Sequence, residues 1–181
     1  MSTVGTPDPD PTSGWLSEAE LAETRRRLPL LYVEALPVRV DGLGRVTEVG
    51  MLLRGNDGEI TRTLVSGRVL YGETLRGALF RHLEKDLGPM AFPLLPASPV
   101  PFSVAEYFPW PGSSQFMDSR QHAVSLAYVV PVTGTCEPRQ DALELTWMTP
   151  AEAASDAVSL EMEGGRGALL RTALASVGRL Y

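Results

Sequence analysis

The chain has 181 residues, of which 44% are hydrophobic, so a single domain with an apolar core is expected. Its formal net charge of −6 gives no general attraction to nucleic acid or to an acidic membrane, and neither is expected as a partner. The single cysteine, Cys136, excludes an intramolecular disulfide and a zinc site made of several cysteines, which fits a reducing cytoplasm.

The N-terminal residues 1–14 are mainly Pro, Asp, Ser, Thr and Gly. Such a stretch buries too little surface to offset the entropy cost of ordering, so we expect a flexible tail followed by one domain over residues 15–181. The stretch has no basic and apolar segments typical of a secretion signal, and no apolar run reaches about 20 residues, so a cytoplasmic protein is expected. One lysine among sixteen basic residues, with abundant Ala, Leu, Gly and Pro, indicates a high-GC bacterial gene.

The first half of the chain predicts one helix and three extended segments. Ser17 is followed three residues later by Glu20, a capping-box pattern that predicts a short helix ending before Pro29. Residues 30–40 and 45–55 are rich in Val and Leu, and the turn sequence DGLG between them favours a β-hairpin or a meander. Residues 60–70 form a third extended segment that leads into a glycine-containing loop and a helix.

The second half is proline-rich before it becomes regular again. Prolines between residues 89 and 119 predict a loop region with one short strand at 102–108. Residues 122–132 and 142–148 read as strands, Thr149 and Pro150 start a helical turn, and an amphipathic helix closes the chain. The sum is an α+β protein, an α/β/α sandwich with a mixed β-sheet.

The helix expected over residues 74–87 carries two polar side chains on the edge of its apolar face. His82 and Asp86 are four residues apart and therefore stack on one side of the helix. A partly desolvated carboxylate in the last helical turn needs a cation beside it, which His82, an arginine or a metal ion could provide. Glu73 stands immediately before the helix.

At this spacing the segment resembles the Nudix box, and residues 31–156 resemble the Nudix fold around it. Five residues match the box pattern at the required spacing: Gly67, Glu73, Arg81, Leu83 and Gly88. The resemblance implies a Mg²⁺- or Mn²⁺-dependent pyrophosphohydrolase that cleaves nucleoside diphosphates linked to another moiety. The three glutamates that form the family's metal site fall on His82, Lys85 and Asp86, so the box is degenerate.

The resemblance assigns roles to several side chains. Asp86, Glu73 and Arg81 are the expected catalytic residues, and His82 with Asp86 is the expected metal site, in which an imidazole suits Mn²⁺ better than Mg²⁺. Lys85, Arg120 and Trp110 are expected to contact the phosphates and the base or sugar of a substrate. The structural positions of the box are Gly67, Gly72, Leu83 and Gly88.

Three functions remain open from the sequence. The first is a Nudix-type hydrolase of a nucleoside diphosphate derivative, or of a related phosphorylated small molecule, with an altered metal site. The second is a Nudix-fold ligand-binding or regulatory module without catalysis, since fold alone does not establish activity. The third is a structural homo-oligomer, for instance a homodimer, in which the box is vestigial.

Overall fold

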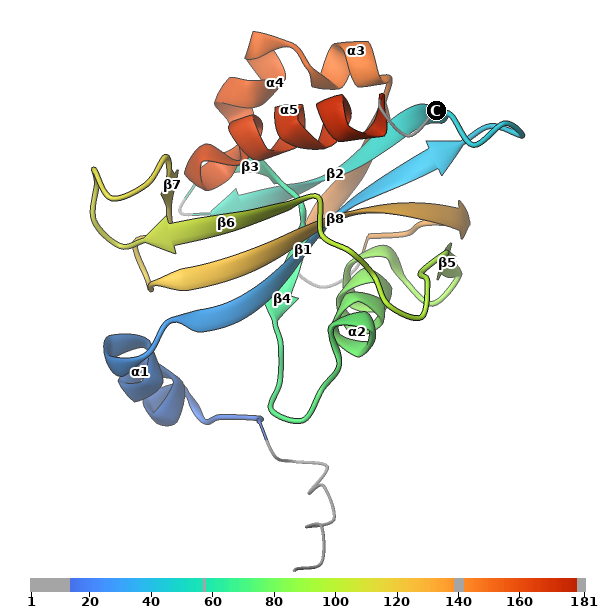
Figure 1. Cartoon of the computed structure of the whole chain (residues 1–181). Helices are drawn as coiled ribbons and strands as arrows, with labels where there is room; N and C mark the ends of the chain where they lie inside the picture. Colours follow the sequence, from blue (N-terminus) through green and yellow to red (C-terminus); the bar gives the residue numbers. More distant parts are fainter. Residues whose placement is uncertain (1–13, 57, 139–141, 179–181) are drawn as a thin grey trace, which may run out of the picture.

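The protein is described by a computed structural model that covers residues 14–56, 58–138 and 142–178. The predicted tail lies outside these ranges except for Gly14. A curled mixed sheet forms the middle layer, with helices on both faces (Figure 1). The strands in chain order are β1 (Leu30–Val40), β2 (Val46–Asn56), β3 (Glu59–Thr63), β4 (Val65–Arg68), β5 (Ala91–Pro93), β6 (Ser103–Phe108), β7 (Phe116–Met117), β8 (Ala123–Gly134) and β9 (Ala142–Met148).

The central strand β1 lies between three neighbours in the sheet. β1 runs parallel to β8, with Leu30 opposite Ala123, and antiparallel to both β2 and β4. The β1–β2 pair is the hairpin that the sequence predicts, with Val38 opposite Val49. The remaining strands extend the sheet from these central ones, so the predicted mixed sheet and α+β class are confirmed.

The helices cap and cover this sheet. They are α1 (Glu18–Arg27), α2 (Leu75–Leu87), α3 (Pro150–Ala153), α4 (Asp156–Glu161), the 3₁₀ turn η1 (Glu163–Gly165) and α5 (Arg166–Val177). In Figure 1, α3, α4 and α5 lie over one face, α2 lies against the other, and α1 precedes β1. The predicted capping box of Ser17 and Glu20 forms, as does a second one of Thr149 and Glu152. No helix of the described residues is long and apolar enough to span a membrane.

Two apolar cores follow from the alternation of side chains along β1. Leu36 and Val38 pack toward α5, whereas Val33 and Ala35 pack toward α2. Each core is closed by a helix whose apolar stripe faces the sheet, which is the expected sandwich arrangement. The sheet therefore holds α2, the box helix, in a fixed position relative to the strands.

Two regions differ from the sequence expectation. The extended segment 60–70 is two strands, because the chain leaves its partner β2 at the buried Leu64 and continues against β1 as β4. In the proline-rich region, the short strands β5 and β7 accompany the expected β6, and α4 adds a helix before α5. These short elements are held by tertiary contacts rather than by local propensity.

Candidate functional site

The loop before α2 is fastened to the helix by Glu73 and Arg81. Arg81 donates from Nε and Nη2 to the two carboxylate oxygens of Glu73, at 2.7 and 2.8 Å, and its Nη2 also donates to the carbonyl oxygen of Arg68. The backbone N–H of Leu70 donates to Glu73 at 3.0 Å. The hydrogen bonds from Arg81 hold the pKa of the Glu73 carboxyl below its usual value. The two residues therefore position the loop.

His82 is buried between α2 and β4. Its Nε2 atom lies 3.0 Å from the carbonyl oxygen of Arg68, which can only accept, so Nε2 carries the proton. Burial lowers the pKa of His82 and keeps the ring neutral. The other nitrogen, Nδ1, is buried without a hydrogen-bond partner and faces Gly67, where even a Cβ atom would come within 2.2 Å of it. Gly67 is thus required because the ring packs against its backbone.

Asp86 is the most deeply buried carboxylate of the box, with 1% of its surface exposed, and it is surrounded by positive charge. Its Oδ1 atom lies 3.0 Å from Nζ of Lys85 and 3.2 Å from Nη2 of Arg54, a residue of β2. Its Oδ2 atom is buried without a hydrogen-bond partner. The sequence anticipated a cation beside Asp86 but did not identify Arg54, because nothing local to β2 marks it.

The residues at the three family carboxylate positions do not fit a divalent metal ion. The free nitrogen of His82 has no room beside it, Lys85 is a cation, and Asp86 is already paired with Lys85 and Arg54. Within the described part of the chain, no cluster of three or more His, Cys, Asp or Glu side chains is arranged to hold a metal. The geometry therefore speaks against His82 and Asp86 as ligands of Mg²⁺ or Mn²⁺, and that role stays a prediction from the sequence.

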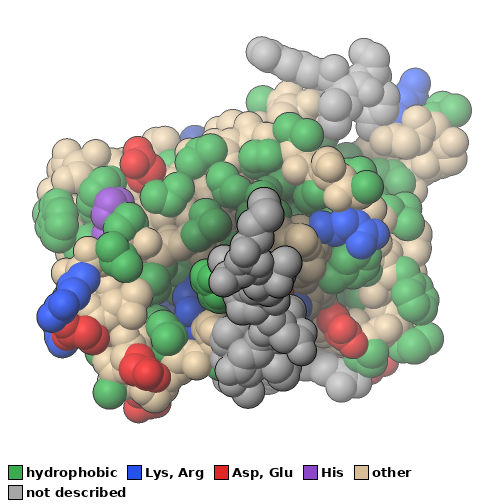
Figure 2. Space-filling view, turned by 60° about the horizontal axis from the view of Figure 1, so that its bottom comes forward, with side chains coloured by type: hydrophobic (Ala, Val, Ile, Leu, Met, Phe, Trp, Pro, Cys, Tyr) green, Lys and Arg blue, Asp and Glu red, His purple; other side chains and the backbone are tan. Residues whose placement is uncertain are grey.

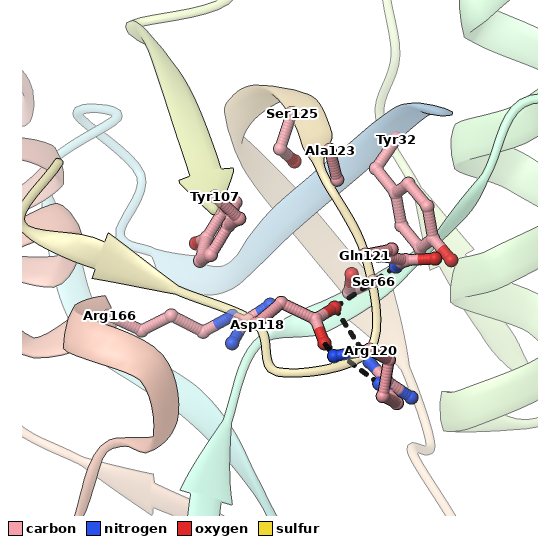
Figure 3. Close-up of a pocket in the computed structure, with 9 residues that line it drawn as sticks. All are labelled: Tyr32, Ser66, Tyr107, Asp118, Arg120, Gln121, Ala123, Ser125 and Arg166. Atoms are coloured by element: carbon pink, nitrogen blue, oxygen red, sulfur yellow. Dashed lines mark hydrogen bonds and ion pairs between the residues drawn. The ribbon is translucent and has the colours of Figure 1, made fainter. Parts of the chain in front are cut away.

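A polar cleft of about 350 Å³ opens beside these residues. Three arginines from different elements line it, namely Arg54, Arg120 and Arg166, together with Tyr32 and the hydroxyl groups of Thr63 and Ser66. Figure 3 shows a smaller pocket that shares Tyr32, Ser66, Arg120 and Arg166 with the cleft. Arg54 belongs both to the cleft wall and to the ion pairs of Asp86, so it connects the cleft to the box.

The cleft residue Arg166 pairs with a buried acid that the sequence analysis missed. Glu34 is 1% exposed and accepts from Nε of Arg166 at 2.5 Å and from the hydroxyl of Tyr107 at 2.9 Å. Burial and the neighbouring carboxylate raise the pKa of Tyr107 above its usual value, so the phenol stays protonated. A glutamate within the apolar run of β1 was the available signal, because a buried acid requires a cationic partner.

The remaining predicted residues divide between this cleft and its surroundings. Arg120 lines the cleft and makes two hydrogen bonds to Asp118, at 2.9 and 3.0 Å (Figure 3). Trp110 does not line the cleft and stands in a neighbouring groove that Arg120 also borders. Gly72 and Gly88 adopt positive φ angles of 78° and 89° at the two ends of the box helix region, and Leu83 is fully buried.

Comparisons with known proteins identify the family. Residues 11–179 match the family described as a domain of unknown function, DUF4916. A crystal structure from Jonesia denitrificans DSM 20603, described as a possible asymmetric diadenosine tetraphosphate (Ap4A) hydrolase, is 60% identical with a TM-score of 0.82, and the match covers 86% of this chain and 98% of that chain. No curated protein matches the chain.

More distant structures share the fold. A Nudix-family hydrolase from Clostridium perfringens is 12% identical with a TM-score of 0.60, and the match covers 85% of this chain and 99% of that one. The Nudix domain of Shewanella oneidensis NrtR, in complex with ADP ribose, is 16% identical with a TM-score of 0.58, covering 90% and 99%. The predicted α/β/α arrangement is thus confirmed as the fold of Nudix hydrolases, and the chain belongs to the DUF4916 family.

Proposed function

We propose that the protein binds a nucleoside diphosphate derivative, or a related phosphorylated small molecule, and that cationic side chains take the place of a box-bound metal ion. The observation that carries the proposal is the position of Lys85 and Arg54, which both lie against one oxygen of Asp86. In the box that the chain resembles, a divalent ion neutralises the pyrophosphate at this place. Here two fixed positive charges outweigh one carboxylate and can attract an anion.

The cationic groups retain the capacity to bind phosphate. Lys85 and Arg54 keep 29% and 27% of their side-chain surface exposed, although their partner Asp86 is buried. The Nε atom of Arg54 is buried, so a ligand would meet the exposed part of this side chain instead. A guanidinium presents donors in a planar fork that matches phosphate oxygens, and an ammonium acts on phosphate as a point charge.

The cleft also suits a ligand of this size. Its volume of about 350 Å³ falls within the usual range of about 300–1,000 Å³ for small-molecule sites. Its lining combines three arginines with two acids, Asp118 and Glu163, two hydroxyl groups and one tyrosine, so cations outnumber anions and the composition favours phosphates and a sugar over an apolar ligand. The Shewanella oneidensis domain with ADP ribose supports a ligand of the nucleoside diphosphate class on this fold.

Isothermal titration with ADP-ribose and ADP in the presence of EDTA tests the proposal. Lys85→Ala and Arg54→Ala should each weaken binding about tenfold, because each removes one cation while leaving Asp86 the other as a partner. Arg45→Ala, in the exposed β1–β2 turn outside the cleft, is the matched control and should bind normally. Unchanged affinity in both Lys85→Ala and Arg54→Ala, with normal thermal unfolding, would rule the proposal out.

Hydrolysis of the bound ligand is the second candidate function. The observation that favours it is the 60% identical relative from Jonesia denitrificans, which is described as a possible diadenosine tetraphosphate hydrolase. The test is a panel of nucleoside diphosphate derivatives with Mg²⁺, Mn²⁺ or Zn²⁺, repeated with Asp86→Asn. Metal-dependent turnover that the variant loses supports hydrolysis at an altered metal site. Binding without turnover supports a ligand-binding module. The absence of both binding and turnover supports the structural homo-oligomer.

A further inference from the structure

A second hollow, of about 340 Å³, lies between the C-terminal end of α1 and the turn that follows β6. We call it the α1 groove. Its walls carry Arg25, Arg26 and Arg27 on one side and Trp110 and Arg120 on the other. None of the box residues lines it, so the Nudix resemblance does not account for its composition.

The α1 groove is positively charged although the chain carries −6 overall. Arg26 and Arg27 both pair with a single acid, Glu23, and Arg25 donates to the neutral side chain of Gln121 at 2.9 Å. Three guanidinium groups on α1 thus have one carboxylate between them. Arginines in the last turn stabilise the helix dipole, but that effect does not require them to face a groove. Figure 2 brings this side of the molecule forward, and blue and red side chains lie together at its left edge, where α1 lies in Figure 1.

The opposite wall offers an exposed aromatic ring in a fixed orientation. Trp110 is 55% exposed, yet its Nε1 donates to Ser113 Oγ at 2.8 Å and its ring lies 5.9 Å from that of Phe108. Phe108 in turn stacks on His122 at 4.4 Å. An immobilised indole that remains half exposed is suited to stacking with a base, because the entropy cost of ordering the side chain is already met.

The cleft and the α1 groove share one wall residue. Arg120 lines both hollows, and its two hydrogen bonds to Asp118 hold the guanidinium at the boundary. A phosphate chain that starts beside Arg54 in the cleft can therefore continue past Arg120 into a second cationic and aromatic site.

We infer that the α1 groove binds the distal phosphate and base of a two-ended ligand, a dinucleoside polyphosphate, whose first nucleoside diphosphate lies in the cleft. The inference rests on the proposed function, because the cleft must hold the first half. It assigns the α1 arginines to the distal phosphates and Trp110 to the second base.

Isothermal titration in EDTA with ADP and with diadenosine tetraphosphate tests the inference. The wild type should bind diadenosine tetraphosphate at least about tenfold more tightly than ADP, because only the longer ligand reaches both sites. Trp110→Ala and the double variant R26A/R27A should each remove about tenfold of that affinity and leave ADP binding within about twofold. Trp110→Phe, which keeps an aromatic face, should retain most of the affinity for diadenosine tetraphosphate.

Phe92→Ala and Arg171→Ala are the matched controls, since both residues are exposed and line neither hollow. If Trp110→Ala weakens both ligands equally, or neither, while the wild type binds ADP, the inference is overturned and the proposed function stands. If the wild type binds neither ligand, both are overturned.

Discussion

At the scale of single residues, Gly67 leaves no room for a side chain beside the ring of His82. A Cβ atom at position 67 would lie 1.8 Å from Cε1 of the imidazole. Gly67→Ala should therefore force the ring out of its position and destabilise the protein by about 1–3 kcal/mol in urea unfolding. The same substitution in a His82→Ala background should cost much less, because the obstructing ring is gone. An equal cost in both backgrounds would show that the contact is not the cause.

The protonation of His82 gives a second prediction for a single residue. Its pKa is lowered in the folded protein by burial, so below about pH 6.5 the unfolded chain binds a proton that the folded one does not. The contribution of His82 to the free energy of unfolding should therefore be constant above this pH. It should make the protein less stable as the pH falls from there toward the pKa of His82 in the folded protein. His82→Gln, which keeps a side-chain donor but cannot titrate, should lose this slope in thermal unfolding between pH 7.5 and 5.

The chain has only two histidines, so His122→Gln is the natural control. A slope that survives in His82→Gln and disappears in His122→Gln would contradict the assignment to His82.

At the scale of elements, the loop between β4 and α2 depends on Glu73. This carboxylate accepts hydrogen bonds from the guanidinium of Arg81 in the helix and from the backbone N–H of Leu70 in the loop. Glu73→Gln should cost about 1–2 kcal/mol of stability and increase hydrogen exchange at Leu70, because hydrogen bonds to a charged group are lost. Glu84→Gln, exposed on the same helix, should leave Leu70 protected. Unchanged exchange in Glu73→Gln would mean that the loop is held by other contacts.

The elements themselves were largely predictable from local patterns. The capping boxes at Ser17 and Thr149 mark helix starts because a side chain and a backbone donor three residues apart satisfy each other, whatever the rest of the fold does. The short strand β7 was not predictable, because its two residues pair only where β6 has already been placed beside them. Local chemistry determines a cap, whereas a two-residue strand requires the completed sheet.

At the scale of the whole molecule, the candidate site depends on contacts between distant residues. Arg166 and Glu34 are 132 positions apart, and Arg54 meets Asp86 from a different strand, so no spacing in the sequence could reveal either pair. The sequence did predict that Asp86 needs a cation and that Lys85 stands among the box ligands. It could not decide between a metal ion and an arginine, because that choice depends on which strand the helix packs against.

The exchange of a metal ion for side-chain cations is tested most directly by the affinity for ADP-ribose in EDTA and in Mn²⁺. If Lys85 and Arg54 hold the phosphates, the two dissociation constants should agree within about threefold, and Lys85→Ala should weaken binding in both buffers. Binding that appears only with Mn²⁺ and is lost in Asp86→Asn would contradict the cationic site and restore a metal to the box.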